Sequence, residues 1–181
     1  MRLETERLVI RNVRVEDAED MHPIRHSQFV MQYNCMKPVT MEAFRAMLER
    51  NKNQDGWLHI QLKETDRVIG MIGVGEDELR YQVNAMTIDY YLGEQYARQG
   101  YMTEALGAVI ERLFENEALE LISARVFGEN EASAALLKKL GFTHEGTLRK
   151  GVRTPDGTAH CDQLFSILRE EFESMKIRPI V

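Results

Sequence analysis

The stretch Asp89-Tyr90-Tyr91-Leu92-Gly93-Glu94-Gln95-Tyr96-Ala97-Arg98-Gln99-Gly100-Tyr101-Met102-Thr103-Glu104-Ala105 decides the fold, because the spacing of the apolar residues changes within it. The residues up to Leu92, from position 81, have the pattern of a long strand. After the stretch, apolar residues recur at helical spacing, at Ala105, Leu106, Val109, Ile110, Leu113 and Phe114. The sequence therefore predicts a strand that turns at Gly100 and enters a helix.

The turn before this helix has the features of an anion site. Glycine permits backbone conformations closed to other residues and lets a ligand approach the main chain. The first amides of a helix lack internal partners and lie at the positive end of its dipole, so a pyrophosphate is a natural guest. The residues expected to contribute are Arg98, Gln99, Gly100, Tyr101, Met102 and Thr103. A plain strand–helix turn that binds nothing remains the alternative, and no GxxxxGK[ST] motif is present.

The segment before this stretch predicts strands and short helices. Alternating apolar residues indicate strands at residues 8–10, 58–62 and 68–74, the last interrupted by glycines. A short helix is expected from Asp17, and Thr40 can cap a second one. Between them, Pro23 and Pro38 are expected to bound an irregular stretch.

The segment after the first long helix predicts one more helix between strands. We expect a strand at 121–126, a helix at 130–140 closed by Gly141, and two last strands at 144–148 and 160–168. This order predicts a mixed α/β sheet of α+β character rather than a doubly wound one. Without repeats or a linker, residues 1–181 are expected to form a single domain.

Composition excludes several classes of protein. A formal net charge of −6 and a pI near 5.5 argue against non-specific binding to nucleic acid. No apolar run approaches the roughly 20 residues that span a bilayer, so we expect no membrane association. Cys35 and Cys161 stand in unrelated contexts, which favours reduced thiols and a cytoplasmic protein.

Three motifs in the right order resemble one family. They are the opening Glu4-Thr5-Glu6-Arg7-Leu8-Val9-Ile10-Arg11, the loop Gly100-Tyr101-Met102-Thr103-Glu104-Ala105, and Asn130-Glu131-Ala132-Ser133 leading to Lys139-Leu140-Gly141-Phe142. The chain is similar over nearly its full length to the GCN5-related N-acetyltransferase (GNAT) family. Within that family it resembles the ribosomal-protein alanine and serine N-acetyltransferase (RimJ/RimL-like) branch.

The resemblance implies acetyl-CoA as cosubstrate and no metal. It also implies a twisted, mostly antiparallel sheet flanked by helices, with a V-shaped splay between two central parallel strands. The main chain at Tyr91 and Leu92 would pair with the pantetheine arm, and the turn at 98–103 would hold the pyrophosphate. Asn130 and Ser133 would line the far side of the cofactor.

One position departs from the family. Many members have a tyrosine at the position of Leu137, where it protonates the departing CoA thiolate. In the resembling branch a serine earlier in the same helix is the proposed acid, which is Ser133 here, one turn before Leu137. A role for Ser133 limited to hydrogen bonding with the cofactor is the alternative.

Acyl transfer to an amine also needs a base, because an ammonium has no lone pair. Asp89 is the first candidate, and a solvent-facing aspartate is the competing interpretation; Glu94 and Glu78 are weaker candidates. Tyr90 or Tyr91 could orient the substrate, with Tyr90 as the first choice; core packing for one and surface exposure for the other is the alternative, since they face opposite ways. His59 is expected on the polar face of its strand.

The acceptor itself is not specified by the sequence. The irregular stretch 26–37 carries large apolar side chains, so we expect it to form a wall of the acceptor site, with Phe29 and Tyr33 binding the substrate. The resemblance implies a primary amine as the acceptor: a protein N-terminus, or a small molecule such as a polyamine or an amine antibiotic. A non-catalytic acyl-CoA-binding module is a third hypothesis, and the apolar C-terminal strands could support a homodimer.

Overall fold

The computed structural model describes residues 1–116 and 118–177 of the chain. Its contacts group the chain into two compact units, each built from two segments. The first comprises Met1–Val74 and Asp89–Val109, and the second comprises Gly75–Ile88 and Ile110–Val181. The boundaries fall inside β4 (Val68–Glu76), β5 (Ala85–Leu92) and α4 (Tyr101–Phe114), so both units share these three elements. The single domain expected from the sequence stays a prediction.

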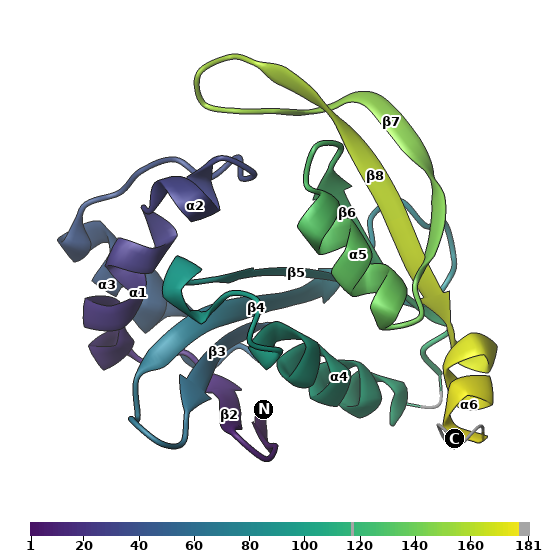
Figure 1. The fold of residues 1–181 in the computed structure, drawn as a ribbon, viewed down its shortest axis with the longest axis horizontal. Coiled ribbons are helices and arrows are strands. Elements are labelled where there is room, and N and C mark those ends of the chain that lie inside the picture. The colour runs from purple at the N-terminus through teal and green to yellow at the C-terminus, as the bar shows by residue number, and fades with distance from the viewer. Residues whose placement is uncertain (117, 178–181) are drawn as a thin grey trace. The chain divides into compact units, whose positions relative to one another are not determined.

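The sheet has eight strands in the order β1-β2-β3-β4-β5-β6-β8-β7 (Figure 1). In the first unit the strands β1 to β3 and most of β4 form antiparallel neighbours, and β2, β3 and the first two thirds of β4 are buried over most of their length. Their bounds are β1 (Arg2–Glu4), β2 (Leu8–Asn12), β3 (Trp57–Leu62) and β4 (Val68–Glu76). The strands predicted around residues 8–10, 58–62 and 68–74 are therefore confirmed.

Short helices pack together in the first unit (Figure 1). They are η1 (Val15–Asp17), α1 (Ala18–Arg25), α2 (Gln28–Met31) and α3 (Met41–Asn51). The cap predicted at Thr40 is confirmed, because its side chain accepts a hydrogen bond of 3.2 Å from the Ala43 amide. Pro23, however, lies inside α1 instead of ending it. Met21 and Ile24 on the buried face of α1 belong to an apolar cluster that also contains Phe44 and Leu48. This packing stabilises the helix around the proline.

A buried ionic cluster lies under these helices. The carboxylate of Asp17 accepts two hydrogen bonds of 2.8 Å from Arg11, one of 2.8 Å from the Arg14 amide and one of 2.7 Å from His59 Nδ1. Burial opposes the charge on Asp17, but these partners hold its pKa well below the usual range. His59 is only 1% exposed, so the expectation that it lies on a polar strand face is wrong. It faces Asp17 because η1 covers that side of β3.

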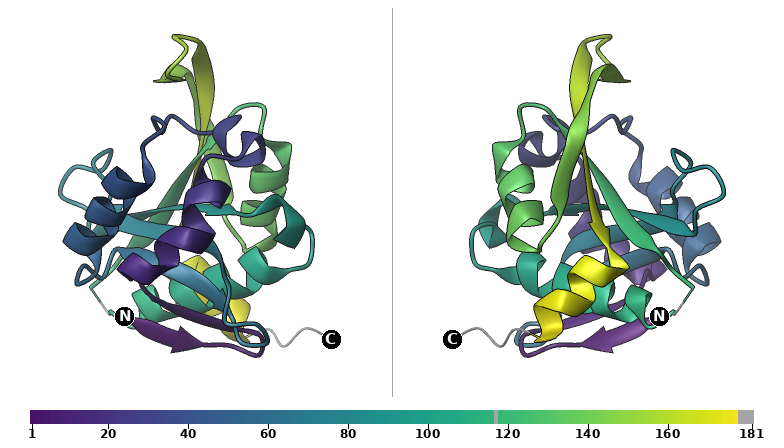
Figure 2. Two further views of the ribbon diagram at one scale, coloured as in Figure 1. Left: turned by 90° about the vertical axis from the view of Figure 1, so that its left-hand side faces the viewer. Right: turned by 90° about the vertical axis from the view of Figure 1, so that its right-hand side faces the viewer.

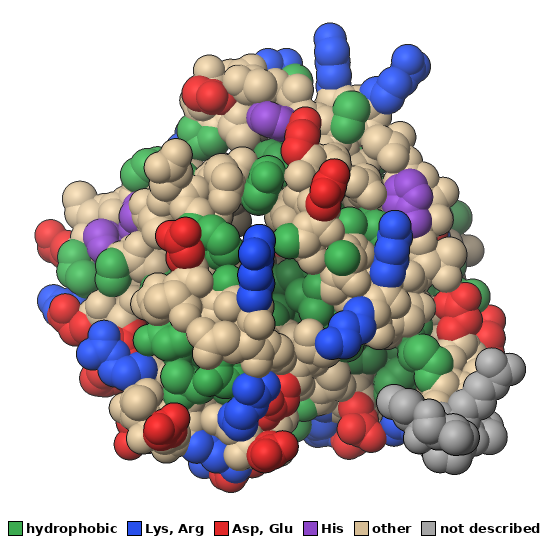
Figure 3. Space-filling view, in the orientation of Figure 1, with side chains coloured by type: hydrophobic (Ala, Val, Ile, Leu, Met, Phe, Trp, Pro, Cys, Tyr) green, Lys and Arg blue, Asp and Glu red, His purple; other side chains and the backbone are tan. Residues whose placement is uncertain are grey.

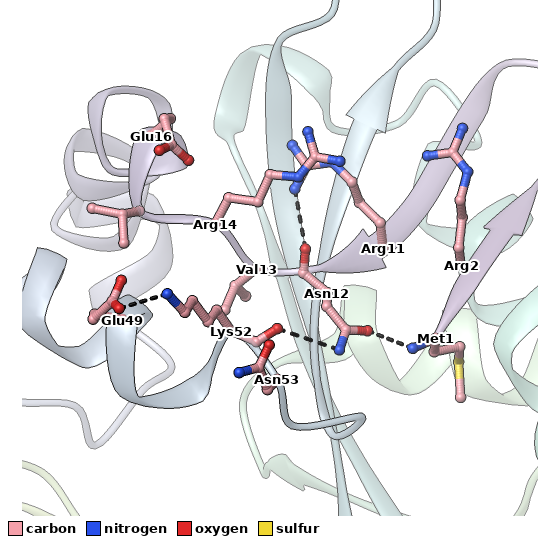
Figure 4. A pocket seen from close by; sticks show the side chains of 11 residues that line it. Met1, Arg2, Arg11, Asn12, Val13, Arg14, Glu16, Glu49, Lys52 and Asn53 are labelled. Atoms are coloured by element: carbon pink, nitrogen blue, oxygen red, sulfur yellow. Dashed lines mark hydrogen bonds and ion pairs between the residues drawn. The ribbon is translucent and has the colours of Figure 1, made fainter.

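A cavity of about 450 Å³ opens between the first strands and α3 (Figure 4). Its lining includes Met1, Asn12, Glu49 and Lys52. These groups bond to one another: the Met1 amino group donates to Asn12 Oδ1 at 2.6 Å, and Lys52 Nζ lies 2.6 Å from a carboxylate oxygen of Glu49. These four polar groups of the lining are thus paired with one another.

The second unit contains a β-hairpin and two helices. Its elements are β6 (Leu121–Phe127), α5 (Glu131–Lys139), β7 (Thr143–Arg153), β8 (Ala159–Leu168) and α6 (Arg169–Ile177). The first half of β5 pairs in parallel with β6, from Ala85↔Leu121 to Ile88↔Ala124, and β8 pairs antiparallel with both β6 and β7. The predicted mixed, mostly antiparallel sheet is confirmed, including a central parallel pair.

The β7–β8 hairpin is longer than predicted. Its outer part extends beyond β6 and α5 of the same unit (Figure 2). Exposed basic side chains, Arg149, Lys150 and Arg153, lie on this part of β7, and Figure 3 shows Lys and Arg side chains projecting at the top of the view. The strand β5 starts at Ala85 instead of 81, because residues 78–83 form turns and bends, the first of which Asp77 closes by accepting a hydrogen bond from the Leu79 amide.

Across residues 1–116 and 118–177, no helix is both long and apolar enough to cross a membrane.

Candidate functional site

Two glycines of β4 bring the second half of β5 unusually close. A Cβ placed on Gly73 would lie 2.3 Å from Oδ2 of Asp89, and one on Gly70 would lie 2.6 Å from the Tyr91 carbonyl oxygen. No real side chain tolerates such contacts. The glycines that interrupt the β4 pattern in the sequence therefore open a recess that receives the Asp89 carboxylate.

Asp89 combines access to solvent with a poorly hydrated carboxylate. Asp89 is an exposed residue, as the competing interpretation expected, yet the protein packed around its carboxyl group raises the pKa of that group by burial. Among the described residues, no side chain or amide donates a hydrogen bond to this carboxylate. A carboxylate with a raised pKa and no fixed donor is a stronger base than an ordinary aspartate. The location on β5 is the one expected from the sequence.

Tyr91 lies two residues further along β5. Burial raises the pKa of its hydroxyl group, the negative charge of Asp89 raises it further, and the positive charge of Arg25 opposes the rise. Tyr91 therefore stays protonated at neutral pH. It packs against the apolar cluster of the first unit, which also contains Phe44.

The turn after β5 begins with η2 (Glu94–Tyr96) and ends at the start of α4. Arg98 and Gly100 have positive φ angles of 60° and 82°. Within the first unit, none of the amides of residues 98–103 donates to another described residue. The turn thus presents the free amides that the sequence predicts.

The β1–β2 connection braces this turn from outside. Glu104 accepts hydrogen bonds from Thr5 Oγ1 at 2.5 Å, the Arg7 amide at 2.9 Å and Arg7 Nε at 2.7 Å. Arg7 also donates to the Gln99 carbonyl at 3.0 Å, and its guanidinium lies 4.4 Å from the Tyr101 ring centre. Partial burial disfavours the Glu104 charge, but these donors lower its pKa. Sequence reasoning missed Arg7, because the contact joins positions 97 residues apart.

The side chains of the turn divide by exposure. Met102 is buried, so only its main chain is available to a ligand. Arg98 and Gln99 are exposed, and Tyr101 and Thr103 are half-buried. The exposed guanidinium of Arg98 is therefore available to an anion that binds at the amides of the turn.

In the second unit, Asn130 caps α5. Its Oδ1 accepts a hydrogen bond of 3.1 Å from the Ser133 amide, which gives the Asn130 side chain a structural role. Ser133 is half-buried, whereas Leu137 is completely buried in the apolar core. Leu137 thus fills space and offers no proton.

The predicted acceptor wall contains the short helix α2. Phe29 on α2 is 36% exposed, and Tyr33 and Tyr90 are half-buried. The segment after it is tied to α1, because His22 Nε2 bonds to the Val39 carbonyl and His26 Nε2 accepts from the Val39 amide, both at 3.0 Å. His22 and His26, which are four residues apart, are therefore hydrogen-bonded to the backbone.

Among the described residues, no three His, Cys, Asp or Glu side chains are grouped to hold a metal.

Arg25, the last residue of α1, was not singled out from the sequence. It is 6% exposed, and Nη1 donates to Met36 Sδ at 3.0 Å. A cation next to apolar residues in a short amphipathic helix gives no sequence signal of burial.

A mixed sheet with a central parallel strand pair, and an amide-lined turn between one of these strands and a helix, defines an acetyltransferase fold. Residues 7–143 match the family model described as the acetyltransferase (GNAT) domain. The chain therefore belongs to the GNAT family of acetyltransferases.

Relatives and solved structures agree with this family. An uncharacterized N-acetyltransferase, YoaA of Bacillus subtilis, is 30% identical, covering 92% of this chain and 96% of its own length. The ribosomal protein uS5 alanine N-acetyltransferase of Escherichia coli is 28% identical, covering 81% of this chain and 80% of its own. A GNAT-family acetyltransferase structure from Bacillus anthracis has the same fold, with a TM-score of 0.83 at 24% identity, covering 94% of this chain and 99% of its own.

Proposed function

We propose that the protein transfers the acetyl group of acetyl-CoA to a primary amine by direct attack of the amine on the thioester. The observation that carries the proposal is the pairing, along one strand, of a recessed carboxylate with an anion-binding turn. Asp89 lies in the Gly73 recess, and the amides of residues 98–103 follow on the same chain segment.

The residues present fit CoA. Unpaired amides at the start of α4 and the exposed Arg98 suit a pyrophosphate, and the main chain at Tyr91 and Leu92 suits the pantetheine amides. For Asn130 and Ser133 the proposal rests on the sequence resemblance. Bound acetyl-CoA supplies the activated acetyl group as a thioester.

Asp89 takes the proton from the ammonium form of the acceptor, directly or through a water molecule. Its raised pKa improves this transfer, because the proton affinities of base and donor approach each other. A main-chain amide near Tyr91 or Leu92 stabilises the negative charge that develops on the carbonyl oxygen. Tyr90 orients the acceptor, together with Phe29 and Tyr33.

Ser133 protonates the departing thiolate in this proposal, because Leu137 cannot. Replacing Ser133 by alanine is expected to lower kcat by about 10- to 100-fold. Ser174→Ala on α6 is the matched control, since it removes an equivalent hydroxyl from an exposed serine. A Ser133→Ala enzyme with unchanged kcat would remove Ser133 from the mechanism and leave it as a cofactor contact.

We propose a protein N-terminal α-amino group as the acceptor, supported by the 28% identity to a ribosomal-protein alanine N-acetyltransferase. The test measures thiol release from acetyl-CoA with N-terminal peptides, polyamines and amine antibiotics, alongside calorimetric binding of acetyl-CoA. Turnover restricted to peptides supports the proposal, and turnover restricted to small amines refutes the acceptor alone. Tight binding without turnover on any amine would leave a non-catalytic module.

A further inference from the structure

Two arginines of the first unit are buried to the same degree but differ in their partners. Arg11 is 5% exposed and forms a two-pronged ion pair with Asp17. Arg25 is 6% exposed, and among the described residues no carboxylate forms an ion pair with it. Buried charges in proteins are normally paired, so the environment of Arg25 lacks an expected anion.

The protein partners of Arg25 are weak. The thioether sulfur of Met36, 3.0 Å from Nη1, is a poor acceptor, and the Phe44 ring centre lies 6.0 Å from the guanidinium carbon. A guanidinium has five N–H donors, and this arrangement uses one of them. In the described part of the chain, the only enclosed side-chain nitrogen or oxygen without a partner is His59 Nε2. The remaining nitrogens of Arg25 therefore still reach solvent, from a largely apolar recess.

A purely structural role is the competing explanation. Arg25 ends α1, where the negative end of the helix dipole attracts a cation. That interaction is weaker than an ion pair, and an exposed lysine or arginine would satisfy it equally well. It does not explain why the guanidinium is buried.

The position of Arg25 links it to the proposed base. The charges of Arg25 and Asp89 both act on the Tyr91 hydroxyl, in opposite directions. Both charged groups therefore lie near enough to Tyr91 for their charges to act on it, and Tyr91 and Arg25 both contact the apolar cluster that contains Phe44. Met36, which bonds to Arg25, belongs to the stretch predicted to form the acceptor wall.

We propose that Arg25 binds a carboxylate carried by the amine acceptor, which makes the substrate class amines with a nearby carboxylate. This inference rests on the proposed acetyltransferase function. A guanidinium fork matches a carboxylate with two parallel hydrogen bonds. A single buried cation among apolar groups neutralises one negative charge, so a carboxylate fits better than a doubly charged phosphate.

The test compares acceptors that differ only in the carboxylate. Each short peptide is used as the free acid and as the C-terminal amide, and each with Glu or Gln at its second residue. We expect one carboxylate position to raise kcat/KM by about 10- to 100-fold, mainly through KM. The two peptide series distinguish a C-terminal carboxylate from a side-chain carboxylate.

Variants assign the preference to Arg25. Arg25→Met keeps the apolar stem and should abolish the acid-over-amide preference, while rates for the amide and the affinity for acetyl-CoA stay within about threefold. Arg45→Met, an exposed arginine of α3 that pairs with Glu19, is the control and should retain the preference. Arg25→Lys keeps the charge without the fork and should retain part of it, which preserves the test if Arg25→Met fails to fold.

Equal kcat/KM for acids and amides in the wild type would overturn the inference, as would an Arg25→Met effect of equal size on both. In either case acetylation of the amides would leave the proposed function intact. Binding of acetyl-CoA with no acetylation of any peptide, polyamine or amine antibiotic would instead refute the function itself.

Discussion

The Asp89 carboxylate occupies the space that a side chain on Gly73 would fill, since a Cβ there would lie 2.3 Å from Oδ2 of Asp89. Gly73→Ala should therefore push Asp89 out of its recess and lower kcat by about 10- to 100-fold. Gly75→Ala is the matched control on the same strand, because a Cβ there meets nothing within 4 Å. Steady-state kinetics at saturating acetyl-CoA measures both. Equal rates for the two variants would separate Asp89 from the chemistry.

The pH dependence of the rate tests Asp89 directly. A base acts in its ionised form, so kcat/KM should rise as the pH passes upward through the pKa of Asp89. Because burial raises this pKa, the acidic limb should lie above the range of an ordinary aspartate. Asp89→Asn should lower kcat/KM by about 100- to 10,000-fold and remove the limb. The exposed Glu94→Gln variant should keep both rate and limb, and a limb that persists in Asp89→Asn would contradict the assignment.

Periodicity predicted most of the sheet and the long helices, because burial of alternate or helically spaced residues leaves a direct mark on the sequence. The same patterns could not locate Arg25 or His59, whose burial depends on partners distant along the chain. The site divides similarly: the turn at Gly100 followed from local geometry, whereas its brace at Arg7 and the recess at Gly73 required the tertiary fold. The short strand β1 and the helix α6 were missed, since each is short and rich in charged residues.

The brace between Arg7 and Glu104 should matter for cofactor binding rather than for chemistry. Arg7→Met removes the bonds to Glu104 and the Gln99 carbonyl, so the turn loses its support from the β1–β2 connection. We expect the Kd for acetyl-CoA to rise by about 5- to 30-fold, with kcat at saturation nearly unchanged. Arg2→Met, which removes an exposed arginine paired with Glu4, is the control. Calorimetric titration measures both, and an unaltered Kd in Arg7→Met would show that the turn is rigid without the brace.

The buried pair of His59 and Asp17 should make stability depend on pH. Burial lowers the pKa of His59 in the folded state below its ordinary value of about 6.5, so the unfolded chain binds a proton at a pH where the folded protein does not. The free energy of unfolding should therefore be constant above about pH 6.5 and fall below it, by at most about 1.4 kcal/mol per pH unit from this group. Asp17, whose folded pKa is also lowered, contributes stability that is lost only at more acidic pH, below about 4.

Urea unfolding between pH 7.5 and 5 measures this slope. His59→Gln can still donate a hydrogen bond to Asp17 but does not titrate, so its stability should be nearly flat over the interval. His144→Gln changes an exposed histidine of β7 and should keep the wild-type slope. A His59→Gln protein that retains the full slope would show that other groups bind the protons, because a neutral buried His59 is the only part of the cluster expected to take up a proton in this range on unfolding.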